Sequence, residues 1–218
     1  MAKSRGFSLV ELLFALGIFS LFMGGMFSIF GRGYQAFHFL SSRQSVQGEL
    51  LRLKTMMGED FGKTHFRSVG SFQRETELGE EQVSRDIACC LTLDDWTDSA
   101  NFRDPTSIPL WNRYVVYRAS MDPEAKLERL IVAPEGDVPF RVRPMLELET
   151  FDAPIKSEKI LSSRVKSFDC RVDGYLQKVI VTLVLSDGGG KRGLDSNSAK
   201  ESFKAEFSWL PYNTVPKL

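Results

Sequence analysis

One segment near the start of the chain limits what the protein can be. Residues 7–30 are apolar apart from a single charged residue, Glu11. As a helix rising about 1.5 Å per residue, this segment reaches roughly 36 Å, enough to cross a hydrocarbon core of about 30 Å. Residues 1–6 precede it and carry Lys3 and Arg5 but no acid. Because basic residues stay on the cytoplasmic side of a span, we expect one pass with the N-terminus in the cytoplasm.

Two ordinary explanations of such a segment leave something unexplained. A secretory signal has an apolar region of about 7–15 residues and a small-residue cleavage site, whereas this run is longer and no such site precedes Tyr34. An uncleaved anchor accounts for everything except Glu11. An acid near the centre of a span costs about 2.5–3.5 kcal/mol, so Glu11 either has a partner or is tolerated at the cytoplasmic interface.

The residues Arg5-Gly6-Phe7-Ser8-Leu9-Val10-Glu11, followed by the apolar run, resemble the N-terminal signal of type IV pilins and pseudopilins. The resemblance implies that residues 1–6 are a leader, and that a prepilin peptidase cuts between Gly6 and Phe7 and methylates the Phe7 amine. It also implies a role for Glu11 in subunit assembly. An unpaired amine in apolar surroundings is expensive, so a neighbour's Glu11 would neutralise it and set the axial register.

The helix is expected to continue past the span as an amphipathic half over residues 31–61. Apolar residues follow one helical face, which predicts packing against the protein's own head: Val46, Leu50, Leu53, Met57 and Phe61. Residues 62–218 then form a β-rich head, with residues 62–85 expected as a loop. The sequence predicts an α+β fold, a long helix packed on an antiparallel sheet. The resemblance implies the ladle shape of pilins.

Strands in the head are predicted from short apolar or alternating runs. They cover residues 86–93, 112–118, 127–133, 167–172, 175–185 and 203–209. Asp173-Gly174 is a strong turn signal and predicts a hairpin between 167–172 and 175–185. Residues 186–200 are expected to be a flexible loop.

Shorter segments narrow the resemblance within the pilin-like family. They resemble the J-type minor pseudopilins of type II secretion and the related W-type minor pilins of type IV pili: residues 59–61 with Arg67, 114–118, 127–130, 165–172 and 179–185. Membership would imply a place in a tip complex with other minor subunits, where the chain initiates filament assembly. The sequence favours neither system strongly.

Composition argues against several other functions. Lys+Arg and Asp+Glu both number 28, and this zero net charge speaks against a nucleic-acid partner. No nucleophile elbow is present, so we expect a non-enzymatic chain without cofactor. The glycine-rich segment 187–193 lacks the Lys-Ser/Thr pair of a phosphate loop. Asp94, Asp95 and Asp98 have no recognised calcium-loop spacing, and no metal is expected.

Three cysteines bear on the compartment. In an oxidising space, Cys170 could pair with Cys89 or Cys90 and leave one thiol over. Buried free thiols are the alternative, because all three lie on predicted strands with apolar neighbours.

Together these features predict a single-pass protein of the bacterial inner membrane with a periplasmic head. The resemblance implies as partners the prepilin peptidase, other minor and major pilins or pseudopilins, and the inner-membrane assembly platform. The competing hypothesis is an uncleaved, membrane-anchored binding module.

Overall fold

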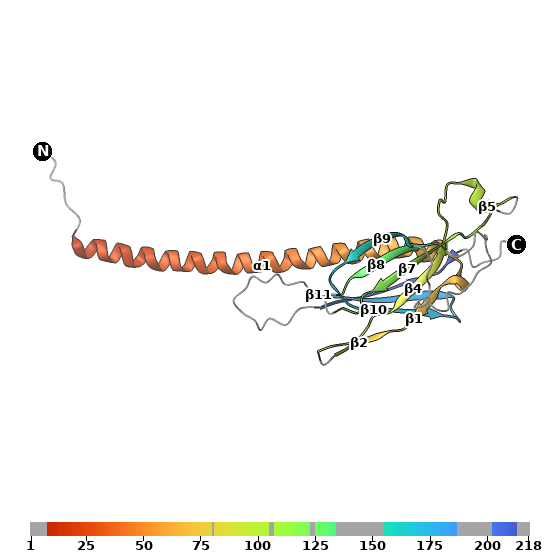
Figure 1. The fold of residues 1–218 in the computed structure, drawn as a ribbon. Coiled ribbons are helices and arrows are strands. Elements are labelled where there is room, and N and C mark those ends of the chain that lie inside the picture. The colour runs from red at the N-terminus through yellow and green to blue at the C-terminus, as the bar shows by residue number, and fades with distance from the viewer. Residues whose placement is uncertain are drawn as a thin grey trace. The chain divides into compact units, whose positions relative to one another are not determined.

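The computed structural model describes residues 8–79, 81–104, 107–122, 125–133, 155–186 and 202–212. A single long helix, α1 (Leu9–Lys63), precedes every described strand (Figure 1). The chain divides within this helix into two compact units, Met1–Ser45 and Val46–Leu218. The helix ends at Lys63, within two residues of the end predicted at residue 61.

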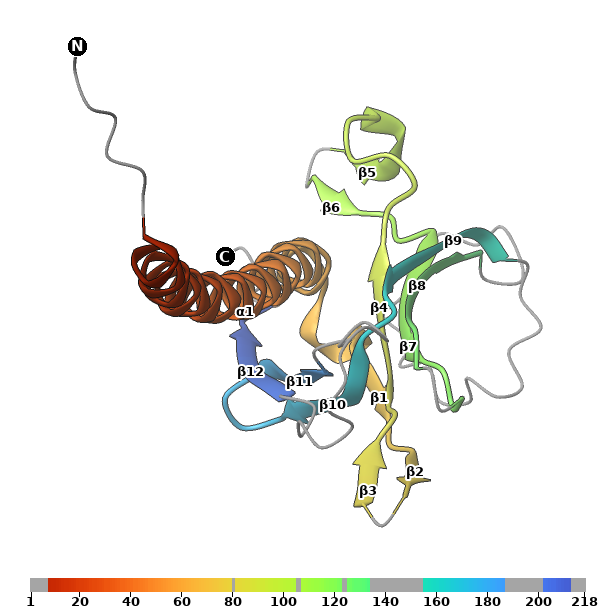
Figure 2. The same cartoon turned by 90° about the vertical axis from the view of Figure 1, so that its left-hand side faces the viewer.

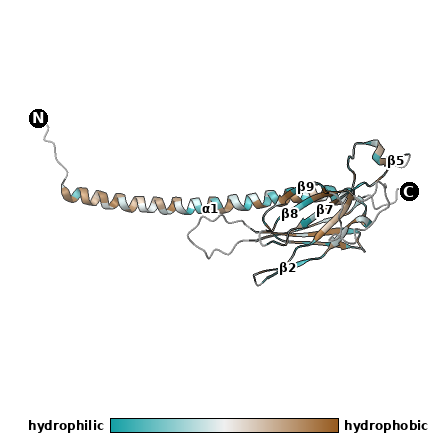
Figure 3. Cartoon of the chain, viewed as in Figure 1, coloured by the Kyte–Doolittle hydropathy of each residue, from teal (hydrophilic) through white to brown (hydrophobic). Residues whose placement is uncertain are grey.

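The described part of the first unit is helical from Leu9 onwards, and Figure 3 colours many of its residues as hydrophobic. The apolar side chains of this part are exposed. Phe14, Leu21 and Phe30 are typical, with 71%, 80% and 66% of their surface exposed. Among the described residues, α1 is the one helix long and apolar enough to cross a membrane. The exposed apolar surface requires an apolar environment, which a bilayer or other helices supply.

The second unit contains two antiparallel sheets beside the later part of α1. Strand order in the larger sheet is β1-β4-β7-β8-β9, with bounds β1 (Gly70–Phe72), β4 (Ile87–Thr92), β7 (Arg113–Ala119), β8 (Leu127–Val132) and β9 (Ile155–Ser162). The smaller sheet has the order β10-β11-β12, with bounds β10 (Val165–Asp173), β11 (Lys178–Ser186) and β12 (Ser202–Trp209). The fold is α+β, as predicted.

Two short hairpins extend from this framework. The first is β2 (Glu75–Leu78) with β3 (Glu81–Ser84), which projects from the sheets in Figure 2, and the second is β5 (Phe102–Arg103) with β6 (Ile108–Pro109). Two single-turn 3₁₀ helices, η1 (Phe66–Ser68) and η2 (Ser99–Asn101), complete the described elements.

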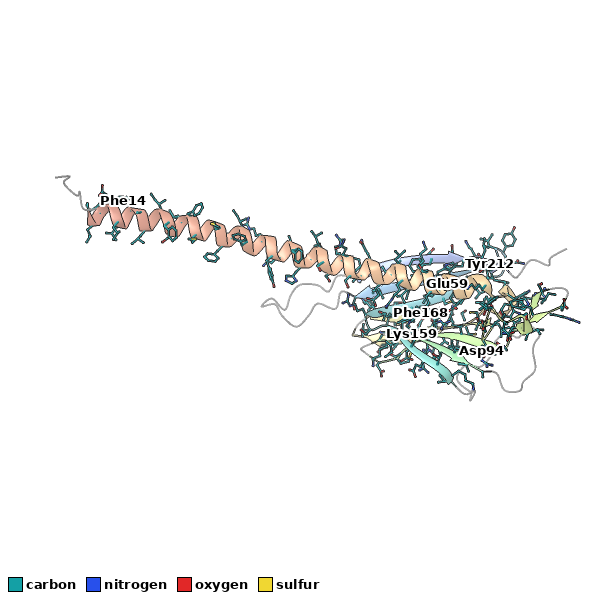
Figure 4. All side chains as sticks on the ribbon, turned by 90° about the horizontal axis from the view of Figure 1, so that it is seen from above. Phe14, Glu59, Asp94, Lys159, Phe168 and Tyr212 are labelled. Atoms are coloured by element: carbon teal, nitrogen blue, oxygen red, sulfur yellow. The ribbon has the colours of Figure 1, made fainter. Side chains whose placement is uncertain are left out.

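One core joins the helix to both sheets. From α1 it receives the predicted stripe, in which Val46, Leu53, Met57 and Phe61 are buried and Leu50 is half-buried. The larger sheet contributes residues such as Val115, and the smaller sheet contributes residues such as Phe168, which lies among the strands in Figure 4. A second cluster, which includes Trp111, lies on alternate residues of the larger sheet. Period-2 alternation produces this division, because successive side chains point to opposite faces of a strand.

Several predictions of local structure were wrong. Residues 62–85, expected as a loop, contain η1 and the short strands β1, β2 and β3. These strands are polar and only three or four residues long, so they lack a detectable alternation. The turn between β10 and β11 covers residues 174–177, so β11 begins at Lys178 rather than at Tyr175. The predicted loop at 186–200 lies outside the described residues after Ser186.

Strand β9, an edge strand of the larger sheet, was not predicted. Its first six residues are exposed on both faces, so no apolar alternation marks them. Lys156, Glu158 and Lys159 are among them, and charged residues of this kind discourage pairing with a foreign strand. The strand forms because it completes an antiparallel ladder with β8.

Candidate functional site

The start of α1 holds the residue that the sequence marks for assembly. The backbone N–H of Ser8 donates to Oε2 of Glu11 at 2.9 Å, and the Ser8 hydroxyl accepts from the N–H of Val10 at 3.3 Å. Ser8 is the N-cap residue and Glu11 the third helical residue, which is the spacing of a capping box; the Glu11 half of the box is formed, and the Ser8 hydroxyl accepts from the second helical residue instead of the third. The carboxylate also lies at the positive end of the helix dipole. Glu11 is thus held at the helix tip by its own chain. Gly6 and Phe7, the predicted cleavage site, lie outside the described residues.

Downstream of Glu11, the span presents apolar side chains to its surroundings. Phe14 projects from the helix surface in Figure 4, and Leu13, Gly17 and Leu21 line an open apolar hollow beside it. A Cβ added at Gly17 would meet nothing within 4 Å. This apolar surface can pack against other apolar helices or acyl chains.

The later part of α1 is joined to the larger sheet by a partly buried polar contact. Both carboxylate oxygens of Asp60 accept from Arg129 on β8, with Nε–Oδ2 at 2.8 Å and Nη2–Oδ1 at 3.1 Å. The Tyr117 hydroxyl on β7 donates to the same carboxylate. Burial, and then the adjacent Asp60 charge, raise the pKa of Tyr117 well above its ordinary value, so the phenol remains a donor. We call these three residues the Asp60 clamp.

The Asp60 clamp brings together segments that carry the J/W resemblance. Asp60 lies in 59–61, Tyr117 in 114–118 and Arg129 in 127–130. Beside it, Arg118 and Glu128 pair across β7 and β8 with Nη2–Oε2 at 2.7 Å. These segments were identified from the sequence, but the contact between their side chains was not predicted.

Two glycines let the C-terminal part of the chain approach α1. A Cβ at Gly58 would lie 2.7 Å from Nε1 of Trp209, and one at Gly62 would lie 3.0 Å from Cε1 of Tyr212. Trp209 stacks on Phe61 with ring centroids 5.7 Å apart. Figure 4 shows Tyr212 near Glu59. Partial burial of the Tyr212 phenol raises its pKa, and the negative charge of Glu59 raises it further. These contacts are structural, and the sequence analysis missed them.

The three cysteines are buried, and the structure records them as free thiols. Cys90 and Cys170 both belong to the main core, whereas Cys89 belongs to the second cluster on the opposite face of β4. Burial raises the pKa of Cys90 and of Cys170 above the ordinary range, so both thiols stay protonated and are poor nucleophiles. Such thiols suit packing rather than catalysis.

A buried acid connects the two sheets. Asp86, which precedes β4, accepts from the backbone N–H of Cys170 at 2.8 Å and of Arg74 at 3.1 Å. Burial raises its pKa despite these two donors. Its partners are backbone groups of the protein itself, which makes it part of the framework.

The acidic loop after β4 has no converging carboxylates. Asp94 pairs with Arg113 at 2.9 Å, Asp95 accepts from Thr97, and Asp98 caps η2. Within the described residues, no group of three or more His, Cys, Asp or Glu is placed to hold a metal ion. Residues 187–193, considered above as a phosphate loop, lie outside the described part of the chain.

The cap that Ser8 forms for α1 was not predicted from the sequence. The signal was present, because Ser8-x-x-Glu11 ahead of an apolar run is the sequence signature of a capping box. Residues 1–27 match the model of the prokaryotic N-terminal methylation motif. This match supports a type IV pilin-like protein, a class that is structural and is processed by a prepilin peptidase. No curated protein and no solved structure gave a significant match to the chain.

Proposed function

We propose that the chain is a minor pilin or pseudopilin, a non-enzymatic subunit that primes a filament at or near its tip. The observation that carries the proposal is the methylation motif at residues 1–27, joined to a helix that starts with Glu11 in a capping box and continues as an exposed apolar span. In this proposal the peptidase cuts between Gly6 and Phe7 and methylates the Phe7 amine. The chain then leaves the inner membrane for the filament, with its head in the periplasm.

The placement in a type II secretion pseudopilus follows the J-type resemblance. Three of its segments meet in the Asp60 clamp, which joins the end of α1 to the larger sheet, and the neighbouring Arg118–Glu128 pair joins β7 to β8. The alternative is a minor pilin of a type IV pilus that serves adhesion, motility or DNA uptake. Co-precipitation with the major subunit of each system, expressed in turn, distinguishes the two.

Processing is tested by the intact mass of the chain extracted from membranes that contain an active prepilin peptidase. We expect the mass to lack residues 1–6 and to gain one methyl group. Gly6→Leu should abolish the cut, whereas Gly17→Leu, a matched change inside the span, should leave it intact. A chain that keeps residues 1–6 beside an active peptidase would leave the membrane-anchored binding module as the function.

Glu11 has two separable roles, and two substitutions distinguish them. Glu11→Gln keeps an acceptor for the Ser8 N–H but removes the charge, because glutamine also serves in a capping box. Glu11→Ala removes both. Filament incorporation that fails in both variants, with cleavage intact, assigns the carboxylate charge to the contact with a neighbour's amine. Normal incorporation of Glu11→Gln would contradict the register role and leave Glu11 as a helix cap.

A further inference from the structure

The segment that follows the span has an unusual charge distribution. Between Glu11 and Glu49 there is no acid, and the charged residues are Arg32 and Arg43. Both come after the apolar run, and aromatic residues lie between them. We propose that residues 32–43, which we call the headgroup collar, bind the headgroups of anionic phospholipids in the leaflet where the span ends.

The position of the collar along the helix agrees with one bilayer thickness. At about 1.5 Å per residue, Arg32 lies about 35 Å and Phe39 about 45 Å along the axis from Leu9. A bilayer with both headgroup layers is about 40–45 Å thick. With Leu9 and the capped Glu11 in one headgroup layer, the collar is level with the other.

The collar surrounds the helix rather than occupying one face. Tyr34, Phe37 and His38 lie on one side, where the His38 ring is 4.2 Å from the Tyr34 ring and 6.1 Å from the Phe37 ring, centroid to centroid. Arg32, Phe39 and Arg43 fall on the other side, since spacings of seven and eleven residues return to the same helical face. A single partner helix would contact one side. A lipid headgroup layer contacts all of them.

Its aromatic residues are exposed as an interfacial belt requires. Tyr34, Phe37 and Phe39 have 67%, 67% and 48% of their surface exposed. Tyrosine is enriched at the membrane–water interface, where its amphipathic ring lies at headgroup level, and Tyr34 has this character. Phe37 and Phe39 add exposed apolar surface next to it. The preceding residues through Phe30 are apolar and exposed, so the collar is continuous with the span.

The Arg43 side chain brings a cation toward the membrane. Its guanidinium carbon is 5.1 Å from the centre of the Phe39 ring, one turn back toward the span. The charge is therefore near the level of Phe39 and not beyond it. Guanidinium groups bind phosphate oxygens with two parallel hydrogen bonds, and each basic residue near an anionic surface raises affinity about fivefold. Arg32 and Arg43 are present with or without residues 1–6, so the inference does not depend on processing.

The test measures lipid preference locally, at the collar. Gln35→Cys introduces an exposed thiol that accepts a fluorescent label, while the three native cysteines are buried. The labelled full chain is placed in bilayers that contain either phosphatidylglycerol or phosphatidylcholine carrying a headgroup quencher. We expect half-quenching at a mole fraction of quencher-bearing phosphatidylglycerol that is severalfold lower than the mole fraction needed of quencher-bearing phosphatidylcholine. This preference should weaken in high salt because of screening.

Variants connect the preference to the arginines. Arg32→Gln with Arg43→Gln should make the two lipids quench equally, whereas Arg67→Gln with Arg171→Gln, two exposed arginines of the second unit, should leave the preference unchanged. Equal quenching by both lipids in the unsubstituted collar would overturn the proposal, as would a preference that survives the double substitution. If the double substitution instead weakens co-purification with a second copy while lipid preference is unchanged, the arginines belong to a helix–helix contact and the lipid proposal falls. Each of these results is independent of leader cleavage.

Discussion

Residues 9–45 and 46–63 form parts of one helix, yet their apolar side chains differ in how they are distributed and in whether they are buried. In the first part the apolar residues cover every face and are exposed, whereas in the second they follow one stripe that packs into the core of the second unit. The stripe packs against residues of the same chain. An all-round apolar surface requires a partner from outside, first a membrane and then, in the proposed function, other helices.

The largest effect expected from this comparison concerns two phenylalanines. Phe61→Ala should destabilise the second unit by about 3–5 kcal/mol, because Phe61 is fully buried between Tyr117 and Trp209. Phe19→Ala, in the exposed span, should leave that stability unchanged. Urea unfolding in detergent, followed by tryptophan fluorescence, measures both, since the three tryptophans all lie after Ser45. Equal effects of the two changes would remove the distinction between the two parts of the helix.

The Asp60 clamp is the next largest contribution. Asp60→Asn leaves Arg129 without its charged partner and should cost about 2–3 kcal/mol, less than a fully buried pair because both side chains keep some exposure. The control is Asp169→Asn, which removes the more exposed pair with Arg171 and should cost under about 0.5 kcal/mol. A double-mutant cycle of Asp60→Asn with Arg129→Met measures the coupling directly. A coupling energy near zero would show that the clamp does not hold α1.

Two glycines of α1 separate close packing from helix propensity. Gly58→Ala places a Cβ 2.7 Å from the Trp209 indole and should destabilise the second unit by about 1–2 kcal/mol after the gain in helix propensity. Gly48→Ala meets nothing within 4 Å and should stabilise it by up to about 1 kcal/mol. Thermal unfolding of the two variants should therefore shift in opposite directions. A stabilising Gly58→Ala would mean that Trp209 moves away at little cost.

The smallest expected effect is on thiol chemistry. Because Cys89, Cys90 and Cys170 are buried and the pKa of the last two is raised, the folded chain should react negligibly with a thiol reagent at mildly alkaline pH. Unfolding without reductant should release three reactive thiols. Release of one thiol instead would demonstrate that Cys170 pairs with Cys89 or Cys90.

Features with a local signal were predictable from the sequence. The span, the stripe of α1, β4, β7, β8 and the β10–β11 hairpin all have a period or a turn residue that a short window reveals. The stripe was predicted because Val46, Leu53, Met57 and Phe61 repeat at helical spacing, which reports a buried face without knowledge of what covers it.

The remaining features depend on residues far apart in the chain. β9 is exposed on both faces and is held by pairing with β8, so its sequence carries no alternation. The close approach at Gly58 depends on Trp209, and the Asp60 clamp depends on Arg129. In each case one partner has no local pattern that indicates the other. The capping box was different, because Ser8 and Glu11 are three residues apart and their pattern was visible.

That capping box changes the energetics of any contact that Glu11 makes with another subunit. In the single chain the carboxylate already accepts a hydrogen bond from the Ser8 N–H. In the proposed function, a neighbour's cationic amine would share the carboxylate with this existing donor, so assembly gains only what the ion pair adds beyond the hydrogen bond already made. That gain is available at the one axial position where an amine meets the helix tip, so the contact would select where a subunit stops.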